Sequence, residues 1–258
     1  MSRTAIFCLF ALLTGCSDPP QVQGVVNDIW NSPITEATVI MEGAAEPVKT
    51  DEQGQFAFLA QDTPMSFSVG KEGYISNSAQ LTPPADDAEM PSVDFALYPK
   101  PDSDGFHLIA QNEYRHLEAA RVSEIGTELR SYTGIADIGQ VAIRTDEKLS
   151  FIFQSTLRAS QLTQLQLQVH RLEFTETVMV PGVEGDTPVG INRWIAVEPV
   201  EFDVKGLNAE NLYMINLRTK VPEGVYAFHV ENLLTNNTPG SLSSTPQEMQ
   251  VAYPFEVK

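Results

Sequence analysis

Apolar and polar residues alternate along much of the chain after residue 21, as expected for β-strands that bury one face. The clearest case is Leu165 to Val169, where apolar residues alternate with glutamine, and Phe56 and Phe58 flank Ala57 in the same way. Short clusters of glycine, proline, asparagine and aspartate separate these segments. The pattern predicts an all-β protein.

The first β-patterned region spans residues 22–98. We expect strands at residues 22–26, 37–41, 55–58, 65–69 and 93–97. Asp51 is placed to accept hydrogen bonds from nearby backbone N–H groups, and Gly54 is suited to a positive φ at the exit of the same turn. Residues 70–74 should close a hairpin, and residues 78–92 read as a loop.

The second region spans residues 106–258. We expect strands at residues 106–110, 149–153, 165–169, 194–197, 200–204, 213–217, 225–230 and 251–257. The apolar positions change phase at Leu172 and Phe174, which predicts a β-bulge near Arg171. The pattern at residues 111–125 is ambiguous, and a short helix is one alternative, because Tyr114, Leu117 and Arg121 would share one face of it. Turns or loops are expected at residues 129–141, 146–148, 181–190 and 235–247.

Residues 99–105 contain two prolines in a polar cluster and are the best linker candidate. The predicted organisation is therefore two β-sandwich domains. The first would have seven strands over residues 22–98, and the second would be a larger, mostly antiparallel sandwich over residues 106–258.

Residues 1–15 have the parts of an export signal: Arg3, an apolar run from Ala5 to Leu13, and two small residues. As a helix this run would be about 14 Å long, too short for a bilayer core of about 30 Å. The residues Leu13-Thr14-Gly15-Cys16 resemble the lipobox of bacterial lipoproteins. An ordinary signal peptide with an incidental cysteine is the alternative.

The lipobox resemblance implies cleavage between Gly15 and Cys16, diacylglycerol on the Cys16 thiol and acylation of the new amino terminus. Residues 16–21 would then form a tether, since two prolines block a helix there. Two or more acyl chains hold a protein stably in a membrane. Ser17, where an aspartate would imply retention in the inner membrane, favours the outer membrane.

The first region also resembles a carboxypeptidase regulatory-like domain. The resemblance implies a transthyretin-like sandwich of about seven strands with a structural or adhesive role, and it brings no catalytic residue. Residues 106–258 resemble no family. The matching segments are residues 24–26, 33–34, 37–39, 50–56 and 71–74.

Composition narrows the range of functions. The chain has two cysteines, Cys8 in the apolar run and Cys16, so the processed protein would have no thiol for a disulfide, metal site or nucleophile. The net charge of −18 opposes binding to nucleic acid and to anionic membrane surfaces. Solubility explains this acidity more simply than the attraction of cations.

Two sequence motifs and the four histidines are candidates for a catalytic or metal-binding site, and each lacks further residues that such a site requires. Ser68-Val69-Gly70-Lys71 matches S-x-x-K on a predicted strand, without the accompanying S-D-N or K-T-G. Asp102 to Gly105 begins like a calcium loop but continues with Phe106 and His107. No metal-binding spacing relates the four histidines, which are His107, His116, His170 and His229.

Aromatic residues offer one further candidate site. Trp194, beside Arg193, is either a core residue of its strand or a stacking platform for a sugar or peptide. Tyr226 and Phe228 share one face, which is expected to be core.

These observations predict a non-enzymatic, lipid-anchored protein of the bacterial outer membrane that binds another envelope protein and needs no metal or cofactor. Two alternatives stay open. The protein could be a carbohydrate- or peptide-binding accessory of a hydrolase, or a hydrolase with its site in residues 106–258.

Overall fold

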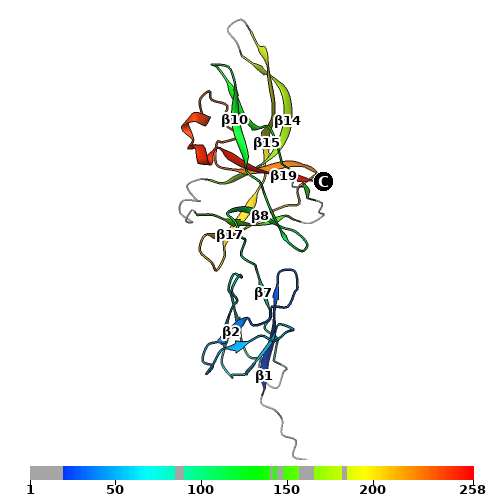
Figure 1. Ribbon diagram of the computed structural model, residues 1–258, viewed down its shortest axis with the longest axis vertical. Helices are drawn as coiled ribbons and strands as arrows, with labels where there is room; N and C mark the ends of the chain where they lie inside the picture. Colours follow the sequence, from blue (N-terminus) through cyan, green and yellow to red (C-terminus); the bar gives the residue numbers. More distant parts are fainter. Residues whose placement is uncertain (1–19, 85–89, 140–141, 144–147, 157–165, 182–184) are drawn as a thin grey trace, which may run out of the picture. The chain divides into compact units, whose positions relative to one another are not determined.

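The computed structural model describes residues 20–84, 90–139, 142–143, 148–156, 166–181 and 185–258. The chain divides into two compact units, with the boundary between Tyr98 and Pro99. Both units are β-sandwiches, so the predicted fold class is confirmed (Figure 1). Within the described residues the helical elements are two 3₁₀ turns, η1 (Leu242–Ser244) and η2 (Gln247–Met249). None of the described helices is long and apolar enough to cross a membrane.

The described residues of the first unit form seven strands in two sheets. One sheet has the order β4-β1-β7 and the other the order β3-β2-β5-β6. β1 pairs with β7 in parallel, and the other strand pairs among the described residues of this unit are antiparallel. The strands are β1 (Gln21–Asp28), β2 (Thr38–Met41), β3 (Val48–Lys49), β4 (Gln55–Leu59), β5 (Met65–Gly70), β6 (Asn77–Leu81) and β7 (Phe95–Leu97).

Alternation along these strands builds the core between the two sheets. Phe56 and Phe58 point inward from β4 and contact each other edge to face, while Ala57 is exposed, as the sequence predicted. Burying one such large side chain contributes about 1.5–3 kcal/mol. The buried set is Val22, Val26, Ile34, Ala37, Val39, Met41, Phe56, Phe58, Met65, Phe67, Val69, Val93, Phe95 and Leu97.

The turn before β4 is organised by side chains. The Asp51 Oδ1 atom accepts hydrogen bonds from the N–H groups of Gln53 and Gln55, and Gly54 has a φ of 74°. Both features confirm the sequence prediction. The preceding Thr50 is buried, and its hydroxyl donates to the Ile34 carbonyl and accepts from the Ala37 N–H.

The loop predicted for residues 78–92 is wrong at its start, because Asn77–Leu81 forms β6. β6 pairs with β5 across the predicted hairpin, and Ala79 and Leu81 pack against the core. Because β6 also contains Asn77, Ser78 and Gln80, its sequence is mostly polar and did not indicate a strand. Residues 85–89 of the predicted loop lie outside the described part of the chain.

In the part of the second unit that the structure describes there are two sheets, of five and seven strands, in the orders β16-β17-β13-β8-β9 and β10-β11-β15-β14-β18-β19-β12. β10 also pairs with β19, so six strands of the larger sheet form a closed hydrogen-bonded circuit. β14 and β15 form the long hairpin drawn in yellow-green in Figure 1. The strands are β8 (Gly105–Ile109), β9 (Tyr114–His116), β10 (Ala120–Gly126), β11 (Ser131–Ile135), β12 (Ala142–Ile143), β13 (Ser150–Gln154), β14 (Gln168–Val180), β15 (Thr187–Pro199), β16 (Phe202–Gly206), β17 (Leu212–Leu217), β18 (Gly224–His229) and β19 (Val251–Val257).

The described residues of the second unit form two hydrophobic clusters. One fills the sandwich and contains Tyr226 and Phe228, which are at most 1% exposed, so their predicted core role is confirmed. The other is formed by strands of the closed circuit together with the segment that follows β18. Its buried residues are Val122, Ile135, Leu172, Val225, Ala227, Leu233, Leu234 and Ala252.

The strand predicted at residues 165–169 is wrong at Gln166 and Leu167, because β14 begins at Gln168, whereas the predicted bulge is present. The register of β14 against β15 shifts between Arg171 and Leu172, which confirms the bulge. The short helix considered for residues 111–125 does not form, since β9 and β10 lie there. The turns expected at residues 129–141 and 181–190 are also shortened by β11 and by the start of β15 at Thr187.

The physical reason for these errors is pairing between distant segments. β11 places Gly134 where a Cβ atom would lie 2.7 Å from the Trp194 carbonyl oxygen, so a glycine inside the strand permits close approach of β15. Residues 146–147 of the predicted hairpin turn, and residue 165 at the start of the alternating segment, lie outside the described residues.

The residues proposed as a linker, 99–105, are hydrogen-bonded to the second unit. The Tyr114 hydroxyl donates to the Pro99 carbonyl, and His107 Nε2 lies 2.8 Å from the Ser103 carbonyl oxygen. The side-chain amide of Gln154 donates to Asp104, and Pro101 is buried.

Candidate functional site

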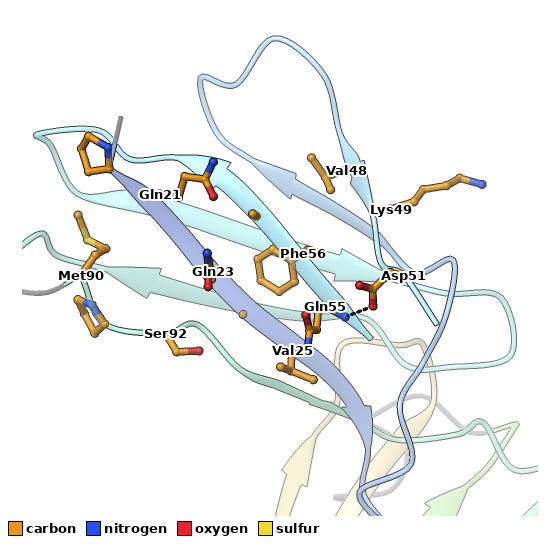
Figure 2. Close-up of a pocket in the computed structure, with 14 residues that line it drawn as sticks. Gln21, Gln23, Val25, Val48, Lys49, Asp51, Gln55, Phe56, Met90 and Ser92 are labelled. Atoms are coloured by element: carbon orange, nitrogen blue, oxygen red, sulfur yellow. Dashed lines mark hydrogen bonds between the residues drawn. The ribbon is translucent and has the colours of Figure 1, made fainter. Parts of the chain in front are cut away.

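A broad, shallow hollow of about 1270 Å³ lies on the first unit (Figure 2). It follows β1 and β4 and reaches the segment before β7 and the short strand β3. Its lining residues are Pro20, Gln21, Gln23, Gly24, Val25, Val48, Lys49, Asp51, Gln55, Phe56, Ala57, Met90, Pro91 and Ser92.

The floor of the hollow follows from strand alternation. Val22 and Phe56 point into the core, so Gln21, Gln23 and Ala57 are exposed. Gly24 brings the backbone close to the segment before β7. A Cβ atom there would overlap the Val93 carbonyl oxygen and lie 2.5 Å from Cζ of Phe56.

The hollow has two charged side chains, and both have partners inside the first unit. Lys49 lies 2.6 Å from the Glu36 carboxylate, and this hydrogen bond lowers the pKa of Glu36. The Asp51 carboxylate accepts the two backbone N–H groups of its turn. The rest of the described lining is uncharged and includes three glutamines, so the formal charge of the described lining is zero in a chain of charge −18.

β4 is an edge strand and borders this hollow. The Ala60 N–H donates to the Pro20 carbonyl and the Val26 N–H donates to the Gly54 carbonyl. With the observed register, the even-numbered residues of β1 and β4 form the hydrogen-bonded pairs. The main-chain groups of Ala57 and Leu59 therefore point away from β1.

A second cluster lies in the other unit, where His170 and His229 are hydrogen-bonded. His229 Nδ1 lies 2.8 Å from the Val230 carbonyl oxygen and therefore carries the proton. His229 Nε2 then accepts from Nδ1 of His170, at 2.9 Å. Burial lowers the pKa of His229 to about 4 and also lowers the pKa of His170.

The other two histidines also lie side by side. His107 and His116 face each other across β8 and β9, with ring centroids 4.8 Å apart, and burial lowers the pKa of His107. Within the described residues, no group of three or more histidine, cysteine, aspartate or glutamate side chains is placed to hold a metal ion. Neither histidine pair lines the hollow.

The remaining candidate motifs are separated from these clusters. Ser68 is exposed on β5, opposite Ser78 of β6, rather than at the helix start that S-x-x-K requires. Within residues 102–105, the Ser103 carbonyl contacts His107 and the Asp104 carboxylate accepts a hydrogen bond from the side-chain amide of Gln154.

Trp194 is half-buried and packs against the cluster of the closed circuit. Its ring contacts the ring of Phe174 edge to face, with the ring centroids 5.5 Å apart, and Phe174 is 48% exposed. Trp194 is therefore partly core and partly accessible beside an exposed aromatic ring.

Gly15 and Cys16 lie outside the described residues. The hollow was not predicted from the sequence, although the positions of three glutamines indicated an uncharged surface. Gln23 and Gln55 lie in predicted strands and Gln21 ends the predicted tether, and three uncharged polar residues at these positions are unusual for so acidic a chain.

No family model matches this chain, and no curated protein matches it. Among solved structures, the major pilin subunit BcpA of Bacillus cereus is similar at 10% sequence identity, over 92% of this chain and 68% of the pilin, with a TM-score of 0.24. A substituted form of that pilin gives 9% identity, 93% and 67% coverage, and a TM-score of 0.26. These scores are too low to support a conclusion about function.

Proposed function

We propose that this protein is a lipid-anchored binding module of the bacterial outer membrane that holds another envelope protein without catalysing a reaction. The observation that carries the proposal is the hollow along β1 and β4. It is an open surface lined by glutamine amides, main-chain groups and apolar side chains, with one basic and one acidic residue among the described lining. β1 begins at Gln21, five residues after Cys16 of the lipobox-like segment.

The anchor is tested by intact-mass analysis and membrane fractionation of the native protein. We expect an acylated chain that begins at Cys16 and sediments with the outer membrane. The control variant Cys16→Ser should be soluble and unacylated. A native chain that begins at Met1, or one without acyl groups, would overturn the anchor.

Binding is tested by crosslinking in intact cells followed by mass spectrometry. We expect one stable envelope partner, crosslinked through the first unit. If instead the purified protein turns over a peptide or glycan panel, and single Asp, Glu or His substitutions abolish the turnover, the non-enzymatic proposal fails.

The contact between Phe174 and Trp194 favours glycan binding as a second candidate function. The chain has two tryptophans, so Trp30→Phe leaves Trp194 as the sole tryptophan emitter. Quenching of its emission by oligosaccharides, lost in Phe174→Ala, would support this candidate. An unchanged emission across a broad panel would exclude stacking on Trp194.

A further inference from the structure

We infer that the hollow receives an extended peptide segment of the partner, which adds to β4 as a fourth strand of the three-stranded sheet. This inference rests on the proposed binding function and names the chemistry of the bound segment. It concerns the outward side of Ala57 and Leu59 and the adjoining surface of β3.

The first support is the unpaired main chain of β4. In the described part of the chain β4 pairs only with β1, and no hydrogen bond reaches the outward N–H or C=O groups of Ala57 and Leu59. At the start of the strand, the corresponding groups of Gln55 are occupied by Asp51. The available edge therefore begins at Ala57.

The second support is that the edge of β4 lacks the features that usually prevent an edge strand from pairing with another chain. Natural edge strands are commonly protected from pairing by a charge, a proline or a bulge. β4 reads Gln-Phe-Ala-Phe-Leu, has a regular register with β1, and exposes 60% of Leu59. Such an edge is a template for the main chain of another strand.

The third support is electrostatic. Among the described lining residues, Lys49 and Asp51 carry opposite charges and the others carry none, so the formal charge of this lining is zero. An uncharged segment therefore fits it without repulsion from this acidic chain. Inward side chains of an added strand would lie near Val48, which packs against the core, and outward ones near Gln55. We expect alternating apolar and uncharged polar residues.

The same lining argues for a peptide over a glycan. Glycan stacking needs an exposed aromatic face, and the aromatic residue in this lining, Phe56, is 5% exposed and packed against Phe58 and Phe95. The main-chain donors and acceptors of the edge instead match an extended backbone.

The test selects binders from a display library of ten-residue peptides, using the full-length lipidated protein in detergent. We expect the selected peptides to be uncharged and alternating, and to slow hydrogen exchange at the amides of Ala57 and Leu59. Ala57→Pro, which removes one outward N–H, should weaken binding about ten-fold. The matched control Ala57→Val keeps this N–H and should bind like the wild type.

Leu59→Lys is a second variant, which places a charge on the exposed edge of β4 and should also weaken peptide binding. Unchanged hydrogen exchange at the Val39 amide shows that either variant is folded. The inference is overturned if no peptide is selected, if selected peptides bind Ala57→Pro and Ala57→Val equally, or if oligosaccharides rather than peptides protect the edge. A cellular partner that crosslinks equally well to Ala57→Pro would overturn strand addition and leave the anchored binding module standing.

Discussion

At the scale of single residues, close contacts between backbone segments determine several positions that composition does not reveal. Gly24 and Gly134 both lie inside strands, where glycine costs stability, and both allow a neighbouring backbone to approach. Gly70 also lies on a strand, but a Cβ atom there would meet nothing within 4 Å. The three glycines look alike in the sequence, and only the packing around them separates their roles.

Gly24→Ala should destabilise the first unit by about 1–3 kcal/mol, because the new methyl group overlaps the Val93 carbonyl oxygen and the Phe56 ring. Gly70→Ala is the matched control and should change stability little. Urea unfolding followed by a probe in the first unit measures both variants. Equal stabilities would show that the strands shift apart at no cost.

The buried pair of His170 and His229 predicts that stability depends on pH. The pKa of His229 is about 4 in the fold and 6.5 in the unfolded chain, so the unfolded chain binds more protons between these values. The contribution of His229 is complete above pH 6.5 and is lost as the pH falls towards 4. It amounts to about 3 kcal/mol.

Urea unfolding of the second unit from pH 7 to pH 4 checks this dependence. His229→Gln, which does not titrate, should show a shallower loss of stability than the wild type. If the two curves run parallel, proton binding at His229 does not control the stability of the second unit.

At the scale of elements, side-chain hydrogen bonds connect turns and loops that are not joined by strand pairing. Thr50 links the turn before β4 to the connection between β1 and β2 through its hydroxyl. The long hairpin of β14 and β15 instead depends on a bulge, which changes the side-chain phase at Leu172. The phase change was visible in the sequence, whereas nothing local indicates which segment Thr50 contacts.

Thr50→Val should destabilise the first unit by about 2–3 kcal/mol, because a buried carbonyl and a buried N–H both lose their partner while the side-chain volume is kept. The control is Thr35→Val at an exposed position. Thermal unfolding monitored by circular dichroism compares the variants. A Thr50→Val protein as stable as this control would mean that water replaces the hydroxyl.

At the scale of the whole molecule, the two units bury separate hydrophobic clusters. The cluster of the first unit ends at Leu97, and both clusters of the second begin after residue 105. Because the described residues contain no cysteine, each unit depends on its own hydrophobic core for stability.

Calorimetry of the full chain should resolve two unfolding transitions, because no buried apolar residue is shared between the clusters. Gly24→Ala should lower the temperature of one transition only. A single transition that shifts as a whole would show that the two units unfold cooperatively.

The sequence by itself determined the all-β class, the two sandwiches, the core positions of Phe56, Phe58, Tyr226 and Phe228, and the bulge near Arg171. These features depend on the alternation of neighbouring side chains, which is a local property. The lipobox resemblance at Cys16 is equally local and is the basis of the proposed anchor.

Only the tertiary structure decided which strands pair. It placed β6 and β11 in segments that read as loops, closed β10 onto β19, and left β4 at an edge beside the hollow. It also brought His170 to His229, 59 residues away. Pairing depends on contacts between distant segments, and a pattern of period two is the same on a central strand as on an exposed edge.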